Sequence, residues 1–263
     1  MQYKYIKANS ILNNVTKKDG LFPGDYTIDP YKNCEYGCSY CDSSFDKTIF
    51  IKSNAAELLD TELSKSKRGI VIVGSVHDPY QKIEKELCLT RELLKIIEKH
   101  NFGCHILTKS NLVKRDIKIL SKINKCQVTI SLTSLNKKIT NIFEKNIPDS
   151  FERLKTVNEL NENGIQSGVA LVPILPHIVE EELEEIIKEA KKHNAQYLVY
   201  KHLELKGDQK DHYLDLLKGF YPELVEKYKR LYENSFKPNE KYIQKLKNEI
   251  EGHCKKYKLE KRV

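Results

Sequence analysis

Three cysteines in a short segment are the residues of this chain best suited to chemistry. Cys34, Cys38 and Cys41 form a C-x3-C-x2-C array, and Gly37 between the first two allows a tight turn. Thiolates this close in sequence can converge on one centre, and soft sulfur ligands select zinc or an iron–sulfur cluster. A structural zinc ion normally has four protein ligands. The array therefore favours a cluster in which one iron has no protein ligand.

The other four cysteines offer no second pair at metal-binding spacing. Cys88, Cys104, Cys126 and Cys254 are solitary in the sequence. Cys104 and Cys126 fall at or beside the starts of predicted strands, where a small buried side chain is the ordinary role. Seven cysteines is an odd number in a chain of 263 residues, which is long enough to fold without disulfides. We therefore expect reduced thiols, metal ligands or both, and no framework of disulfides.

The elements that position the array are short apolar runs that alternate with amphipathic stretches. The runs are rich in β-branched and aliphatic residues, which is typical of strands buried on both faces. They cover residues 48–52, 70–74, 104–108, 127–131, 167–172 and 196–200. Helix-like segments follow them, for example 89–97 and 181–191. Repeated βα units predict an α/β fold, as an open doubly wound sheet or as most of a TIM-like barrel.

The chain divides into three predicted parts. Residues 1–33 read as a looping N-terminal cap, residues 34–205 hold the cluster loop 34–41 and six βα units, and residues 206–263 are helical in period. The last part carries 15 Lys and Arg against 10 Asp and Glu, a net charge of +5, with six tyrosines among them. Such a segment can bind nucleic acid, or its tyrosines can pack back on the core as a solvated helical extension.

Composition limits the class of protein. The chain is 40% apolar and 31% charged, so it can form a packed core, and its formal net charge of +8 suits a polyanionic partner. It has no run of eighteen apolar residues, and its N-terminal segment lacks the apolar stretch of a secretory signal. We expect a cytoplasmic protein without a membrane segment. The sequence predicts no oligomeric state.

The cysteine array, with the aromatic Tyr40 before its third cysteine and with six βα units after it, resembles the radical S-adenosylmethionine (SAM) superfamily. The resemblance implies a partial (β/α)6 TIM-like barrel and a [4Fe–4S] cluster on Cys34, Cys38 and Cys41, whose fourth iron binds the amino and carboxylate groups of SAM. It also implies that one electron from the reduced cluster cleaves SAM, and that the resulting 5′-deoxyadenosyl radical abstracts hydrogen from a substrate. A reduced ferredoxin or flavodoxin would supply the electron.

Four further segments resemble the spore-photoproduct-lyase-like group of this superfamily, often labelled DNA repair photolyases. Residues 26–31 (YTIDPY) precede the cysteines, whereas 78–81 (DPYQ), 107–110 (LTKS) and 131–133 (SLT) follow the second, third and fourth predicted strands. The similarity covers roughly residues 8–205. The last three segments fall at C-terminal strand ends, where a TIM-like fold binds its ligands.

The resemblance implies SAM-binding roles for residues at these ends. Tyr40 would place its backbone beside the adenine, and carbonyls of Gly74 and Ser75 would accept from the SAM amino group. Lys109 would pair with the SAM carboxylate, and Ser131 would hydrogen-bond the ribose.

Val172 and Pro173, which close the fifth predicted strand, would line the adenine pocket. Each assignment has an ordinary structural alternative. The aromatic could simply pack, the glycine could form a turn, the lysine could be solvated, the serine could cap the backbone and the proline could end the strand.

The candidates for the substrate pocket are His77, Asp78, Tyr80 and His177, all predicted at C-terminal strand ends. Asp78 could accept a proton or a substrate hydrogen bond, or it could form a turn before proline. Spore photoproduct lyase uses an additional cysteine beyond the second strand as hydrogen-atom donor, and residues 73–79 contain none. The sequence therefore names no catalytic residue.

Three functions remain open from the sequence. The first is a radical SAM enzyme, with lyase or oxidoreductase chemistry, that acts on an unidentified substrate for which a nucleic acid fits the charge. The second is the same radical chemistry on a peptide or small metabolite. The third is a non-catalytic, zinc-stabilised nucleic-acid-binding protein, which would hold a colourless, redox-silent metal.

Overall fold

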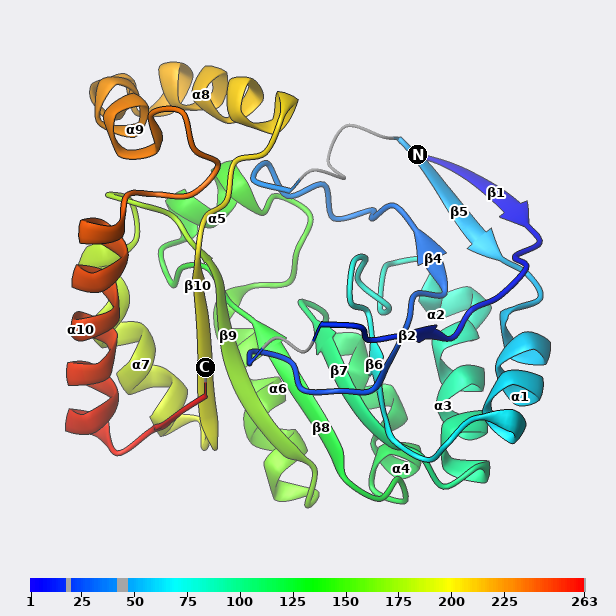
Figure 1. Ribbon diagram of the computed structural model, residues 1–263. Coiled ribbons are helices and arrows are strands. Elements are labelled where there is room, and N and C mark those ends of the chain that lie inside the picture. The colour runs from blue at the N-terminus through cyan, green and yellow to red at the C-terminus, as the bar shows by residue number, and fades with distance from the viewer. Residues whose placement is uncertain (18–19, 42–46, 263) are drawn as a thin grey trace.

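A curved, mostly parallel sheet forms the centre of the fold in the computed structural model, which describes residues 1–17, 20–41 and 47–262 (Figure 1). Its strand order is β11-β10-β9-β8-β7-β6-β3-β2. The strands are β2 (Asn13–Asn14), β3 (Tyr26–Ile28), β6 (Ile70–Val73), β7 (Gly103–Thr108), β8 (Cys126–Ser131), β9 (Gln166–Ile174), β10 (Tyr197–His202) and β11 (Glu260–Lys261). Every neighbouring pair is parallel except β2 with β3. The predicted α/β fold with a parallel, TIM-like sheet is confirmed.

Helices between the strands cover the outer face of this sheet (Figure 1), namely α1 (Ala55–Lys65), α3 (Leu89–Lys99), α4 (Ile117–Leu120), α6 (Ser150–Glu162) and α7 (Leu183–Lys192). Two short helices, α2 (Glu84–Leu87) and α5 (Lys137–Phe143), belong to the segments that follow β6 and β8. Short 3₁₀ helices cover Asn111–Asp116 and Glu180–Glu182. The apolar positions of α3 lie at helical spacing and are buried, and α7 has acids in its first turn and lysines in its last, as the helix dipole favours.

Five of the six predicted strands belong to the large sheet, but the first one does not. The run 48–52 forms β5 (Thr48–Lys52), which pairs with β1 (Gln2–Ile6) and β4 (Tyr31–Lys32) in a separate three-stranded sheet. The first parallel strand of the large sheet is β3, inside the part of the chain predicted as a cap. β3 is only three residues long, and its pairing with β6 is non-local, so periodicity does not reveal it. The cysteine array therefore follows the first strand of the sheet and does not precede it.

The C-terminal part is helical, as expected, and its tyrosines pack inward. It contains α8 (Asp208–Phe220), a 3₁₀ turn at Pro222–Leu224, α9 (Val225–Tyr232) and α10 (Glu240–Tyr257), which lies along α7 (Figure 1). Tyr213, Tyr228, Tyr232 and Tyr242 are buried. The Tyr228 and Tyr232 hydroxyls donate to carbonyls that follow β9 and β10. Of the two interpretations of this segment, the packed extension is correct for these four tyrosines. No helix among the described residues is long and apolar enough to cross a lipid bilayer.

Candidate active site

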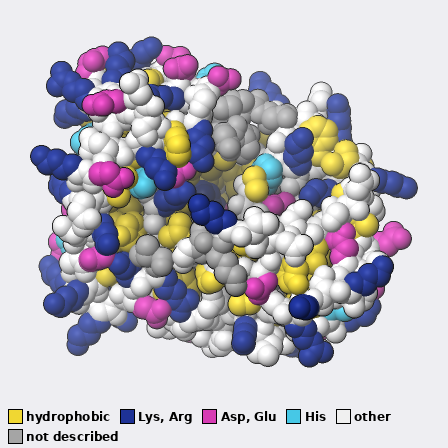
Figure 2. Space-filling view, viewed as in Figure 1, with side chains coloured by type: hydrophobic (Ala, Val, Ile, Leu, Met, Phe, Trp, Pro, Cys, Tyr) yellow, Lys and Arg dark blue, Asp and Glu magenta, His cyan; other side chains and the backbone are white. Residues whose placement is uncertain are grey.

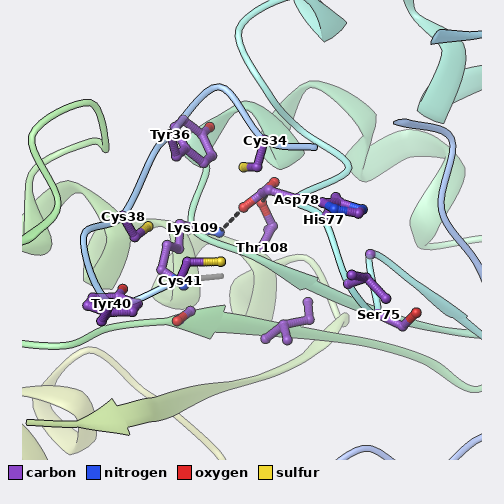
Figure 3. A pocket seen from close by; sticks show the side chains of 14 residues that line it. Cys34, Tyr36, Cys38, Tyr40, Cys41, Ser75, His77, Asp78, Thr108 and Lys109 are labelled. Carbon is purple, nitrogen blue, oxygen red and sulfur yellow. Dashed lines mark hydrogen bonds between the residues drawn. The ribbon is translucent and has the colours of Figure 1, made fainter. Parts of the chain in front are cut away.

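The three cysteines line one pocket with residues from the C-terminal ends of β6, β7 and β8 (Figure 3). The empty space of this pocket, including its open mouth, is about 510 Å³. Its lining includes most of the predicted site residues, namely Cys34, Cys38, Tyr40, Cys41, Gly74, Ser75, His77, Asp78, Lys109 and Ser131. Residues that lie far apart in the sequence are thus brought together where a parallel α/β fold binds its ligands. We call this space the cysteine pocket.

The cysteine loop is fixed by groups from distant segments. The buried Gln81 amide bonds to it twice, because Oε1 accepts from the Glu35 N–H at 2.8 Å and Nε2 donates to the Asn33 carbonyl at 2.9 Å. Further along the loop, the Ser39 N–H donates to the Phe143 carbonyl at 3.0 Å. Such long-range bonds hold the thiols in place without regular secondary structure in the loop.

The turn after β6 requires glycine and is held by Asp29, a residue of the segment 26–31 to which no role was assigned from the sequence. Gly74 has φ +83°, and a Cβ there would lie 2.4 Å from Cδ of Pro79. Asp29, directly after β3, accepts from the Ser75 hydroxyl at 2.7 Å and from the next two backbone N–H groups at 3.0 and 3.2 Å. Asp29 therefore shapes the wall of the pocket that faces the cysteines.

Asp78 braces the strand ends with its own carboxylate. Its Oδ1 accepts from the Thr108 hydroxyl at 2.7 Å and the Tyr80 N–H at 2.9 Å, and its Oδ2 accepts from the Lys109 N–H at 2.7 Å (Figure 3). Burial raises the pKa of Asp78, although these bonds lower it in part. Both oxygens have protein partners, so the turn-forming role is the one seen here.

Lys109 extends into the cysteine pocket. Its Nζ lies 5.8 Å from the centroid of the Tyr40 ring, and its side chain has no hydrogen bond or ion pair to the described residues. Burial lowers the pKa of Lys109, but the Cys38 thiol and the carboxylates of Glu144 and Asp78 raise it further, so that the net shift is upward. The ammonium is therefore charged at neutral pH and directed at the thiols.

A buried ionic network around Glu144 contacts the cysteine loop through Tyr40. The sequence did not predict this network. Glu144 accepts from the Tyr40 hydroxyl, from Thr133 Oγ1 at 2.9 Å and from Arg153 Nη2 at 2.7 Å. The Arg153 and Glu144 side chains are each 1% exposed, and Arg153 also donates to the Ser131 carbonyl at 2.8 Å. Burial raises the pKa of Glu144, but Arg153 and Lys109 bring it below its ordinary value. The network joins the cysteine loop to the end of β8.

Three thiols from one short loop are a donor set that fits an iron–sulfur cluster. Within residues 1–17, 20–41 and 47–262, no group of three His, Cys, Asp or Glu side chains is arranged to hold one metal ion. In a cluster each thiolate binds a different iron, so that the sulfurs need not meet at one point. Burial raises the pKa of the Cys34 and Cys38 thiols to about 12, so both thiols are protonated at neutral pH when no metal is bound. Binding of iron would therefore displace their protons.

A second pocket adjoins the first on the side of β9 and β10. Val172 and Pro173, the predicted adenine contacts, line it together with the cysteine-loop residues Tyr40 and Cys41. Its remaining lining is Lys201, His202, Leu203, Glu204, Lys206 and Gln209. Figure 2 shows that this face of the molecule is hollowed near its centre, with Lys or Arg side chains at the edge of the hollow.

Gln209 of α8 connects the C-terminal part to the cysteine loop. It is 8% exposed and its Nε2 donates to the Tyr40 carbonyl. Nothing in the sequence singles it out, because the contact spans 169 positions of the chain.

Two predicted pocket residues lie elsewhere. Tyr80 is fully buried, and its hydroxyl donates to Asp116 at 3.1 Å, on the side of the turn that faces away from the cysteine pocket. His177 has φ +60°, and its ring packs at 6.3 and 6.0 Å from those of Tyr228 and Tyr242. Both residues follow a strand, as predicted, but the local turn sends their side chains away from the thiols.

The cysteine pocket also contains no fourth cysteine among its described lining residues. Cys88 lies at the junction of α2 and α3, where its Sγ is 3.6 Å from Nη1 of Arg115. A cysteine hydrogen-atom donor like the one used by spore photoproduct lyase has no counterpart in this lining.

Comparison with known proteins agrees with this geometry. The family model described as the radical SAM superfamily matches residues 28–190, a span that begins at β3 and includes the cysteine loop. The chain belongs to the radical SAM superfamily. Membership implies an iron–sulfur cluster and SAM as cofactors, and it confirms the resemblance read from the cysteine array.

Relatives of this radical SAM protein occur in archaea and bacteria. It is 32% identical to an uncharacterized protein of Methanocaldococcus jannaschii over 84% of each chain. It is 25% identical to an uncharacterized protein of Mycobacterium tuberculosis, covering 97% of this chain and 80% of that one.

Among solved structures, the fold resembles spore photoproduct lyase. A variant of that enzyme bound to a dinucleoside spore photoproduct matches with a TM-score of 0.74 and 15% identity, over 97% of this chain and 79% of the other. Streptococcus suis SuiB bound to its precursor peptide matches with a TM-score of 0.60 and 16% identity, over 89% of this chain and 47% of that one. At these identities the likeness shows the fold.

Proposed function

We propose that this chain is a radical SAM enzyme that holds a [4Fe–4S] cluster on Cys34, Cys38 and Cys41 and acts on a nucleic acid. The observation that carries the proposal is the meeting of three thiols and the Lys109 ammonium in one pocket at the ends of parallel strands. When bound, the cluster and SAM supply a 5′-deoxyadenosyl radical that abstracts hydrogen from the substrate.

Lys109 is the residue that we assign to the carboxylate of SAM. A charged ammonium in a partly dry pocket binds a carboxylate through a strong, charge-assisted hydrogen bond. The Glu144 carboxylate is bonded to Arg153 at 2.7 Å, and the Asp78 carboxylate accepts from backbone N–H groups and the Thr108 hydroxyl. The Lys109 side chain has no hydrogen bond or ion pair to the described residues, so its ammonium is available to an anionic group.

The other SAM contacts are assigned to backbone groups and small side chains. Gly74 and Ser75 line the cysteine pocket, and we assign their carbonyls to the amino group of SAM. The Ser131 hydroxyl has a 3.3 Å bond to the Val172 carbonyl and is assigned to the ribose. Val172 and Pro173 line the adjoining pocket, where an adenine would find apolar walls.

Charge and shape support a nucleic acid substrate. The formal net charge is +8. Lys201 and Lys206 line the adjoining pocket and share one acid, Glu204, at 3.0 and 3.1 Å, so that this group carries a net charge of +1. The match covers 79% of the chain of the spore photoproduct lyase variant solved with a dinucleoside, but only 47% of the chain of SuiB solved with a peptide. His77 lines the cysteine pocket and is assigned to the substrate. We further propose a cytoplasmic location and a ferredoxin or flavodoxin as electron donor.

Anaerobic reconstitution with iron and sulfide tests the cofactor assignment. We expect about four irons per chain, a spectrum of the dithionite-reduced protein that changes when SAM is added, and slow formation of 5′-deoxyadenosine. Cys38→Ala should lower the iron content, whereas Cys88→Ala, which removes a thiol outside the pocket, should leave it unchanged. One zinc per chain with no cluster and no SAM cleavage would contradict the proposal and favour a zinc-stabilised binding protein.

Transfer of deuterium into 5′-deoxyadenosine tests the substrate class. Deuterated DNA, RNA, peptide and metabolite pools are offered separately to the reconstituted protein. Label from a nucleic acid pool is the expected result. Label only from peptides or small metabolites would overturn the nucleic acid assignment and leave the radical chemistry intact.

A further inference from the structure

A third pocket lies on the opposite side of the cysteine loop and shares one wall with the cysteine pocket. Tyr36 lines both pockets. This pocket has an empty space of about 660 Å³, and its other lining residues come from the segment 80–82, from Lys85 of α2, and from the segments 110–112 and 145–148. We call it the outer pocket.

The lining of the outer pocket is bonded directly to the cysteine loop. Gln81 lines it and makes the two hydrogen bonds to Asn33 and Glu35 described above. Asn146 lines it as well, and its Nδ2 donates to the Tyr36 carbonyl at 3.4 Å. The backbone between Cys34 and Cys38 is therefore the partition between the two pockets, so that a molecule seated outside would reach the cluster ligands across a single layer of chain.

Three lysines without ion pairs surround the outer pocket. Lys82, Lys85 and Lys145 are exposed and line it, and none forms a salt bridge or side-chain hydrogen bond within the described residues. Some lysines on the helices do pair with an acid one turn away, as Lys95 does with Glu92 at 2.7 Å. This cluster is thus an uncompensated positive patch.

The acids near this patch are turned away from it. Glu84 is buried and bonds to Arg115 Nη2 at 2.6 Å. Glu35 accepts from the Tyr3 hydroxyl and from the Ile83 N–H at 2.8 Å. Glu86 is exposed on α2 but does not line the outer pocket. The outer pocket therefore presents positive charge to a partner.

We infer that the outer pocket is the docking surface for an acidic electron-transfer protein. The inference rests on the proposed function, which requires a one-electron donor. The reduced donor would lose one electron, the cluster that we assign to Cys34, Cys38 and Cys41 would gain it, and no atom would be transferred. The cysteine pocket is assigned to SAM and substrate, so a protein donor needs another approach to the same loop. The outer pocket offers that approach with complementary charge.

Binding measurements on a triple charge reversal test this assignment. Lys82→Glu, Lys85→Glu and Lys145→Glu are combined in one variant, and the control variant combines Lys227→Glu, Lys241→Glu and Lys255→Glu, which are exposed lysines of the C-terminal helices with the same change in net charge. The probes are a [2Fe–2S] ferredoxin and a flavodoxin, both acidic. Affinity is measured anaerobically at several salt concentrations, and 5′-deoxyadenosine formation is followed with the reduced probe or with dithionite.

We expect the wild type and the control to bind a probe in a salt-dependent manner, and the triple variant to bind at least about ten-fold more weakly at low salt. Donor-driven SAM cleavage should fall in parallel, while dithionite-driven cleavage should be unchanged. Equal loss in both variants, no binding of either probe to the wild type, or loss of single-stranded DNA binding in place of probe binding would overturn the inference. Absence of cleavage with dithionite in the wild type would instead contradict the proposed function.

Discussion

Replacing Glu144 by Gln should destabilise the protein by about 3 kcal/mol. The change leaves the Arg153 guanidinium, 1% exposed, without its carboxylate. Breaking a buried pair by removing one partner costs about 3–5 kcal/mol because the remaining charge stays buried. The lower end applies here, since Arg153 keeps its bond to the Ser131 carbonyl and the new amide can still accept from Tyr40. At about 2–4 °C per kcal/mol for a chain of this size, the melting temperature should fall by roughly 6–12 °C.

A double-mutant cycle with Arg153→Met separates the pair from the rest of the network. Urea unfolding of the metal-free protein under reducing, anaerobic conditions gives the four free energies. The double variant buries no unpaired guanidinium. Its loss in free energy of unfolding should therefore be at least about 2 kcal/mol smaller than the summed losses of the two single variants. Glu152→Gln on the same helix is the matched control, because its bond to Lys155 is exposed and should contribute less than about 1 kcal/mol. Additive losses, or a loss below about 1 kcal/mol for Glu144→Gln, would refute the reasoning.

Three further predictions concern the same site. Stability should fall as the pH drops below 4.5, the ordinary pKa of a Glu. The pKa of Glu144 is lower in the folded state than in the unfolded state, so this carboxylate stabilises the fold above the unfolded pKa and loses that contribution as the pH falls through the folded pKa. Acid titrations followed by circular dichroism should show a smaller fall in stability for Glu144→Gln than for the wild type. Gly74→Ala should unfold at lower urea than Gly164→Ala, since both have positive φ but only Gly74 lacks space for a Cβ, and equal midpoints would contradict this. Lys109→Met should weaken SAM binding about ten-fold or more, as measured by calorimetry, without lowering the iron content of the protein. The SAM affinity of the control Lys145→Met should equal that of the wild type.

The large sheet was largely readable from the sequence because its strands are nearly continuous apolar runs. β7 and β8 are buried on both faces, so their composition differs sharply from that of the helices around them. β3 has three residues and is recognised only through its pairing with β6. β5 has the composition of a core strand, yet it pairs in the small sheet. Composition identifies a strand, but it does not say which sheet the strand joins.

The candidate site was readable where residues sit in the cysteine array or directly at a strand end. Lys109 and Ser131 reach the cysteine pocket because each closes or follows a buried strand. Tyr80 also follows a strand, but the turn made by Asp78 directs its side chain to the opposite side. Arg153 stands on a helix, at a position that the sequence would assign to solvent. Its role depends on a tertiary contact that no local pattern encodes.

The cysteine loop acts as a partition, and its two sides should respond to different changes. Lys109 stands on the inner side with a free ammonium, and Lys82, Lys85 and Lys145 stand on the outer side. An inner charge held in a partly dry pocket acts on a bound anion at short range and is weakly screened, whereas exposed outer charges act on an approaching protein and are screened within about 8 Å at physiological salt. Loss of Lys109 should therefore change SAM affinity at every salt concentration. Loss of the outer lysines should change donor binding chiefly at low salt and leave SAM affinity unaltered. If one set of substitutions altered both affinities together, the two pockets would not be separate sites, and the loop would have to transmit changes from one side to the other.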